Sequence, residues 1–283
     1  MLRSSVKSNI KTVLRDPTTV LALIAAVIMM YLYGLNVQIN ELDVDPLGFG
    51  PYDFVANKLM GAVLRPVGYL AYPFIAIVIA VNIFKDRRTD MLDVAFSSQL
   101  SYRVYFFGKL IAYYAVALGM CLLVTLSYDI LFCLRFQPHR ADVDWGRMLL
   151  MLLVCRLVAY LFCLPLPIAF ALFFSGVTGV SATGVIFNCA YRYLGSVFYW
   201  FDYSWIAFYA YRIPIKLEIY LKYWVLHIGE PLSTVIGDPK SALVADLHSS
   251  FSQALTSVLA LCVLSTAMIA ASYFLLKRRF GKA

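Results

Sequence analysis

Tyr105–Cys133 reads YFFGKLIAYYAVALGMCLLVTLSYDILFC, and its only charged side chains are Lys109 and Asp129, near its two ends. A helix needs about 20 mostly apolar residues to cross the hydrocarbon core of a bilayer, which is about 30 Å thick. The stretch is therefore predicted to be a transmembrane helix. Because Asp129 lies close to one end of this helix, we expect its carboxylate to be hydrated rather than catalytic.

The whole chain has a similar composition. Of its 283 residues, 62% are hydrophobic and 14% are charged, whereas soluble domains have about 45–50% apolar and about 25% charged residues. A water-soluble fold could not remove this much apolar surface from water. The composition excludes a soluble enzyme, a nucleic-acid-binding module and a disordered scaffold. It predicts an all-α membrane protein, with residues 1–283 forming a single transmembrane domain.

Other stretches have the length and apolarity of membrane spans, although Asn188, Arg192 and several glycines interrupt the fifth. The six predicted transmembrane helices are 18–37, 63–84, 105–133, 148–174, 183–201 and 251–276. Pro165 and Pro167 lie within the fourth. A proline removes a backbone donor and bends a helix, so neighbouring spans are expected to bond the carbonyl groups that it frees.

Lys and Arg are concentrated on one side of the predicted bundle. The segment before the first span, the loop after the second and the C-terminal tail, counted together with Lys109 at the start of the third span, hold thirteen basic and four acidic residues. Because cytoplasmic loops carry an excess of Lys and Arg, both termini are predicted to be cytoplasmic in a multi-pass plasma-membrane protein. On the opposite side, 202–250 is predicted to be an extracellular or re-entrant segment. Its Tyr and Trp side chains fit an interfacial aromatic belt or, alternatively, an aromatic platform for a substrate.

The N-terminal residues 1–16 are predicted to form an amphipathic elbow helix. Its basic residues recur every four positions on one face: Arg3, Lys7, Lys11 and Arg15. A helix with such a cationic face lies in the plane of an anionic leaflet, where it contacts membrane lipid; the alternative is a solvated basic leader. Asp16 followed by Pro17 is typical of an N-cap and a first helical position, so a second helix is predicted to begin there.

The predicted cytoplasmic loop 86–103 contains a short, half-apolar helix flanked by charges. Its central residues are Met91, Leu92, Asp93, Val94, Ala95 and Phe96. The helix is too short to cross a membrane. It fits insertion into a groove of a partner protein or, alternatively, an interfacial position in which it touches only lipid.

Two arginines, Arg156 and Arg192, fall in the middle of predicted spans. An arginine at the centre of a membrane helix costs about 2.5–3.5 kcal/mol on insertion scales, so each is expected to face a cavity, a carboxylate or a carbonyl. Each could contact a polar group of a substrate or hold two helices together. Arg192 could also extend its side chain to the membrane interface.

Motifs for catalysis or metal binding are missing from the sequence. There is no G-x-x-x-x-G-K-[ST] loop for the phosphates of ATP and no H-E-x-x-H pair, and the three histidines are dispersed. The chain is therefore expected to be no enzyme and to bind no metal.

Three stretches together resemble the permease subunit of type-2 ABC exporters. They are Leu14–Pro17 before the first span, Asp86–Asp93 with Ser97-Ser98 and the Gly108-Lys109 pair that follows, and the basic tail after the last span. The resemblance implies that Met91–Phe96 is a coupling helix. It also implies a second permease, as homodimer or heterodimer, and two cytoplasmic ABC ATPase subunits that carry the ATP and Mg, with no cofactor on this chain.

The expected function is therefore export of an amphipathic substrate, such as a peptide, a lipid-like molecule or a drug, driven by a separate ATPase subunit. The competing hypotheses are a non-transporting membrane anchor or sensor and an intramembrane enzyme. An anchor would not need proline-bent spans and buried arginines, and an enzyme would need acid, base or nucleophile groups that the sequence does not present.

Overall fold

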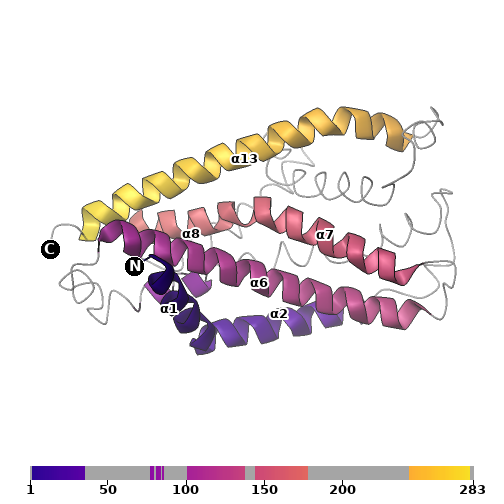
Figure 1. Cartoon of the computed structure of the whole chain (residues 1–283), viewed down its shortest axis with the longest axis horizontal. Coiled ribbons are helices and arrows are strands. Elements are labelled where there is room, and N and C mark those ends of the chain that lie inside the picture. The colour runs from indigo at the N-terminus through magenta and orange to yellow at the C-terminus, as the bar shows by residue number, and fades with distance from the viewer. Residues whose placement is uncertain are drawn as a thin grey trace.

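The structure is a computed structural model of the chain, and it describes residues 2–35, 77–79, 81–83, 85, 101–137, 144–177 and 242–280. All regular structure in this part of the chain is helical. Its long helices are α1 (Leu2–Arg15), α2 (Pro17–Leu35), α6 (Tyr102–Phe136), α7 (Trp145–Cys163), α8 (Pro165–Val177) and α13 (Ala242–Phe280). Residues 77–85, as far as they are described, are helical as well (Figure 1).

Three helical stretches are long and apolar enough to cross a membrane. They are Tyr102–Arg135 in α6, Trp145–Phe174 in α7 and α8, and Val258–Arg278 in α13. They overlap the predicted third, fourth and sixth spans, so the described part of the chain is all-helical and contains helices of the membrane-spanning kind.

The other predicted spans are described only in part or not at all. Helix α2 lies where the first span is predicted, and its apolar stretch Pro17–Ile28 is shorter than a full span. Of 63–84, only 77–79 and 81–83 are described, and 183–201 lies outside the described residues. The number of six spans therefore stays a prediction.

Two boundaries differ from the predicted ones. Helix α13 begins at Ala242, before the predicted start at 251, which is possible because a helix satisfies its own backbone hydrogen bonds in water as well as in lipid. Tyr102 and Arg103, predicted to end the cytoplasmic loop, belong to α6. The side chain of Ser101 caps this helix by accepting a hydrogen bond from the backbone N–H of Val104 at 3.4 Å.

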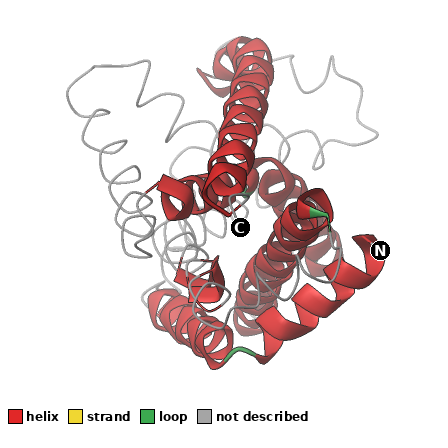
Figure 2. Cartoon of the chain, turned by 90° about the vertical axis from the view of Figure 1, so that its left-hand side faces the viewer, coloured by secondary structure: helices red, strands yellow, loops and turns green. Residues whose placement is uncertain are grey.

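Helix α6 is central to the described fold. It packs against α1, α2 and α7, while α13 packs mainly against α8. The fully buried side chains of this core include Ile79, Met148, Met151, Leu152 and Ile168. Figure 1 shows α1 crossing one end of the bundle at a steep angle to α2 and α6, and Figure 2 views that end and places α1 at the periphery.

The basic segments meet at this end of the bundle. The ring of Tyr273, near the end of α13, lies 5.2 Å from that of Tyr102 and 5.3 Å from that of Phe106, both at the start of α6. Four residues beyond Tyr273, Lys277 is exposed. Both chain ends also lie here (Figure 1). Helix α1, the start of α6 and the basic end of α13 therefore share one end of the molecule.

The predicted proline bend divides the fourth span at Leu164, between α7 and α8. Pro165 has no N–H to donate to the carbonyl four residues earlier, which is that of Leu161. The hydroxyl of Tyr114 on α6 donates a hydrogen bond to this Leu161 carbonyl at 2.9 Å. The neighbouring helix thus supplies the donor that the proline lacks, as expected for helices in a membrane.

Candidate functional site

Asp16 forms the junction between α1 and α2. Its Oδ1 accepts a hydrogen bond from the backbone N–H of Thr18 at 2.9 Å, and its carbonyl accepts one from Thr19 at 3.0 Å. Pro17 occupies the first helical position, where no N–H is needed. Asp16 is therefore the N-cap of α2, in agreement with the sequence prediction.

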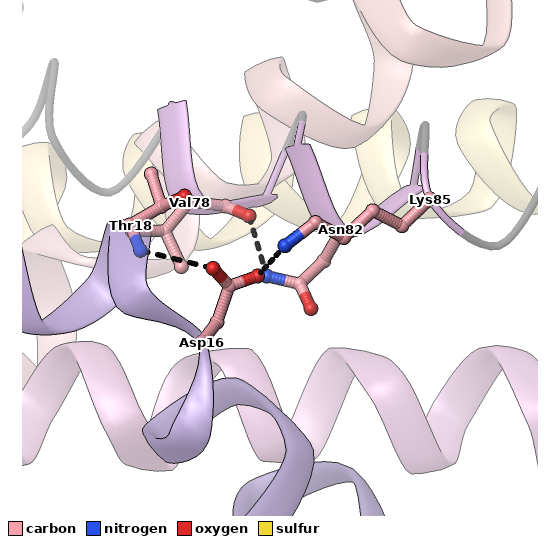
Figure 3. Close-up of polar contacts among 5 residues, drawn as sticks. All are labelled: Asp16, Thr18, Val78, Asn82 and Lys85. Carbon is pink, nitrogen blue, oxygen red and sulfur yellow. Dashed lines mark hydrogen bonds and ion pairs between the residues drawn. The ribbon is translucent and has the colours of Figure 1, made fainter.

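The second carboxylate oxygen of Asp16 binds a residue from a distant part of the chain. Lys85 Nζ donates to Asp16 Oδ2 at 2.6 Å, and the side chain of Asp16 is 4% exposed while that of Lys85 is 52% exposed (Figure 3). Asn82, one turn before Lys85, donates from Nδ2 to the carbonyl of Val78 at 2.9 Å. Lys85 lies immediately before the predicted cytoplasmic loop 86–103, so the ion pair fixes the start of that loop to the α1–α2 junction.

Electrostatics keep Asp16 ionised. Burial of the carboxyl group opposes ionisation, but the hydrogen bonds from Lys85 and from Thr18 outweigh burial and lower the pKa of Asp16 below its ordinary value. The N-terminus of α2 also favours a negative charge at this position. The carboxyl group of Asp16 is therefore charged at neutral pH.

Helix α6, which follows the same loop, also touches α1. A Cβ atom added at Gly108 would lie 2.5 Å from the Ser5 hydroxyl and 3.2 Å from the Ser5 Cβ, so any larger residue would displace the Ser5 side chain, and glycine favours the close approach of α1 to α6. The neighbouring Lys109 places its ammonium 5.3 Å from the ring centre of Tyr105, within range of a cation–π contact. The Gly-Lys pair singled out in the sequence thus lies at a helix–helix contact.

A second ion pair is enclosed between α6 and α7. Arg156 Nη2 lies 3.6 Å from Asp129 Oδ1, and both side chains are 0% exposed. This finding corrects the expectation that Asp129 is hydrated. Its carboxylate instead pairs with Arg156, the arginine that was predicted to need a partner. Neither oxygen of Asp129 accepts a hydrogen bond within the part of the chain that the structure describes. The attraction is therefore ionic rather than a short hydrogen bond.

The other predicted site residues divide into two groups. The basic residues of α1 are all exposed: Arg3, Lys7, Lys11 and Arg15. The coupling-helix candidates and the second intramembrane arginine lie outside the described residues: Met91, Leu92, Asp93, Val94, Ala95, Phe96 and Arg192. Their roles stay predictions.

The sequence singles out Arg156 and Asp16 but does not identify the residues that they contact. Asp129 is the only acidic residue in 105–133, and 148–174 contains none, so a search for the partner of Arg156 would have found it. The pairing of Asp16 with Lys85 has no comparable signal, since many acids and bases flank these helices.

No group of three or more His, Cys, Asp or Glu side chains that could hold a metal ion occurs among the residues described. Comparison of the chain with models of protein families, with curated proteins and with solved structures found no match.

Proposed function

We propose that the chain is the permease subunit of an ATP-driven exporter, in which a separate cytoplasmic ATPase acts on the loop 86–103. One observation carries the proposal: the residues on either side of this loop are attached to the N-terminal segment. Lys85, just before the loop, binds Asp16 at the α1–α2 junction, and Gly108, near the start of α6, lies against Ser5 of α1. Force applied to Met91–Phe96 would therefore act on α1 and α6 together.

The gathering of basic segments at one end of the bundle supports a cytoplasmic position for that end. Exposed basic residues of α1 lie there, and so does the basic end of α13. Cytoplasmic faces of membrane proteins carry this excess of Lys and Arg. An ATPase beneath the permease would thus reach the loop from the cytoplasm.

Within the membrane, motion of α6 would be passed to α7. Arg156 and Asp129 join these helices through a buried ion pair, and Tyr114 joins them through the hydrogen bond to Leu161. Closure of two ATPases would then move the helices of each permease as rigid bodies, opening the substrate path first to one side and then to the other. The apolar side chains of the spans favour an amphipathic substrate. Pairing with a second permease, identical or different, would complete the transporter.

The test replaces an apolar residue of the proposed coupling helix with Asp. Leu92→Asp or Phe96→Asp would place a charge on the surface that enters the ATPase groove, so we expect loss of ATPase binding and of substrate-stimulated ATP hydrolysis. Both are measured on the complex purified in mild detergent from its native membranes.

Ser101→Asp is the matched control because it adds the same charge to the same segment. Aspartate is also a good N-cap, so α6 should keep its start. We expect this variant to bind the ATPase normally. Normal binding and stimulation in Leu92→Asp and Phe96→Asp would contradict the proposal.

A further inference from the structure

An apolar groove with two cations lies between α1 and α6. Its volume is about 510 Å³, and it is lined by Leu2, Arg3, Val6, Lys7, Ile10 and Ile111. Arg3 and Lys7 are exposed, and neither forms an ion pair with any residue in the described ranges. The groove therefore combines an apolar wall with two exposed positive charges.

The apolar wall continues along α6, away from the basic end of the bundle. Exposed positions follow one another at intervals of four residues, so that each lies beside the next along a ridge that winds slowly around the helix: Phe107, Ile111, Ala115, Gly119 and Leu123. A Cβ atom added at Gly119 would meet no other atom within 4 Å. Beyond Ile111 this face thus has a shallow, open surface.

We propose that the groove binds one anionic phospholipid of the cytoplasmic leaflet. Arg3 and Lys7 contact the phosphate of the headgroup, and one acyl chain lies against Ile111 and continues toward Gly119. Two observations carry this assignment: the charge of the two cations complements a phosphate, and the apolar stripe gives the acyl chain a surface to cover. A free phosphate would satisfy only the first.

This site goes beyond a general attraction of α1 to an anionic surface. All four basic residues of α1 would contribute to such an attraction, at about 1 kcal/mol for each residue near the surface. Only Arg3 and Lys7 line the groove, however, while Lys11 and Arg15 are exposed elsewhere on the same helix. A bound lipid would join α1 to α6 whether or not an ATPase is attached.

The first experiment compares two double variants of the full-length chain in detergent. Arg3→Gln/Lys7→Gln removes the cations of the groove, and Lys11→Gln/Arg15→Gln removes the same charge from outside it. Phosphatidylglycerol binding is followed by native mass spectrometry of the purified protein, after equilibration with the lipid at about 0.15 M salt, where exposed charges are screened beyond about 8 Å.

We expect the groove variant to weaken phosphatidylglycerol binding by about 25-fold, the product of about fivefold for each cation. The matched variant should stay within about twofold of the wild type because its charges are screened. Equal losses in the two variants would show adsorption to a basic helix and overturn the proposal. Equal binding of phosphatidylcholine with the same acyl chains would overturn it as well.

A second pair of variants tests the acyl chain. Ile111→Trp fills the groove, and Ile130→Trp places the same side chain at another exposed position of α6. Phosphatidylglycerol binding should fall at least tenfold in the first variant and be unchanged in the second. Unchanged binding in Ile111→Trp, or displacement of the lipid by inorganic phosphate at equal concentration, would contradict an acyl-chain site.

Discussion

Two pairs of oppositely charged side chains join helices of this chain, and they differ in their contact with solvent. Asp16 and Lys85 approach to 2.6 Å, with more than half of the lysine side chain exposed. Asp129 and Arg156 are 3.6 Å apart, and neither is exposed. In the first pair the exposed lysine binds the carboxylate that caps α2. In the second, each charge depends on the other because water does not reach either.

Because the two ion pairs differ in solvent exposure, they suit different roles. An exposed ion pair contributes about 0–1 kcal/mol and can open at little cost, which would suit a connection to the loop that we propose the ATPase acts on. A buried pair costs several kcal/mol to break when one partner is removed. It suits two helices that move as one body. The following predictions test this contrast.

The largest effect is expected at Arg156. Arg156→Met leaves the carboxylate of Asp129 buried without its cation, so the free energy of unfolding should fall by about 3–5 kcal/mol. Adding Asp129→Leu removes the remaining charge and should restore at least most of the loss, since apolar replacements of buried ion pairs are often neutral or stabilising. Unfolding of the wild type, the single variant and the double variant in the same detergent measures both effects. Equal stability of wild type and Arg156→Met would show that the Asp129–Arg156 pair does not stabilise the fold.

Substitutions of Asp16 separate its two contacts. Asp16→Ala removes both the cap and the ion pair, and the loss of stability should be about 1–2 kcal/mol. Asp16→Asn keeps an oxygen that can accept from Thr18, so its loss should be confined to the ion pair and stay below about 1 kcal/mol. Thermal unfolding of the two variants distinguishes them. If Asn is as damaging as Ala, the cap is not the larger contribution.

Tyr114 provides an uncharged connection between the helices that the buried pair joins. Tyr114→Phe removes the donor to the Leu161 carbonyl, and the expected loss is about 1 kcal/mol, as for other hydrogen bonds between membrane helices. The same unfolding assay applies, with Tyr113→Phe as a control on the same helix, because the Tyr113 hydroxyl has no hydrogen-bond partner among the described residues. A loss as large as that of Arg156→Met would mean that the proline bend, rather than the ion pair, is the main connection of α6 to α7.

The smallest effect is a pH dependence at Asp16. Because its pKa in the folded protein is lowered from 3.8, its contribution is complete above pH 3.8 and is lost as the pH falls through the folded-state pKa. Lys85→Met removes the hydrogen-bond donor that lowers this pKa. We therefore expect a stability difference between wild type and Lys85→Met near pH 7 that shrinks below pH 3.8 and with added salt. A difference that grows in acid would contradict the assignment.

The sequence predicts local features of this fold well because their causes are local. Pro17 after a capping residue marks the start of α2, and Pro165 marks the bend between α7 and α8. Apolar length identifies the helices that can cross a membrane. It does not give the rotation of a helix about its axis, and that rotation decides whether Asp129 meets water or Arg156.

Contacts between distant segments escape the sequence for the same reason. Lys85 and Asp16 are far apart in the chain, and nothing in the residues around either one selects the other. The hydroxyl of Tyr114 could not be identified as the donor to Leu161 until α6 and α7 were placed side by side. The sequence does show which groups require a partner from another helix: an arginine in a span requires one, and a proline leaves a carbonyl without its donor.

The most direct test of a permease driven through its cytoplasmic loop is substrate movement and ATP hydrolysis measured together in proteoliposomes. These would contain the chain with the ATPase that co-purifies with it. We predict substrate movement that requires ATP in the wild type, and the loss of both movement and stimulated hydrolysis in Leu92→Asp but not in Ser101→Asp. ATP-dependent movement at the wild-type rate in Leu92→Asp, or a chain that binds no ATPase, would contradict the account.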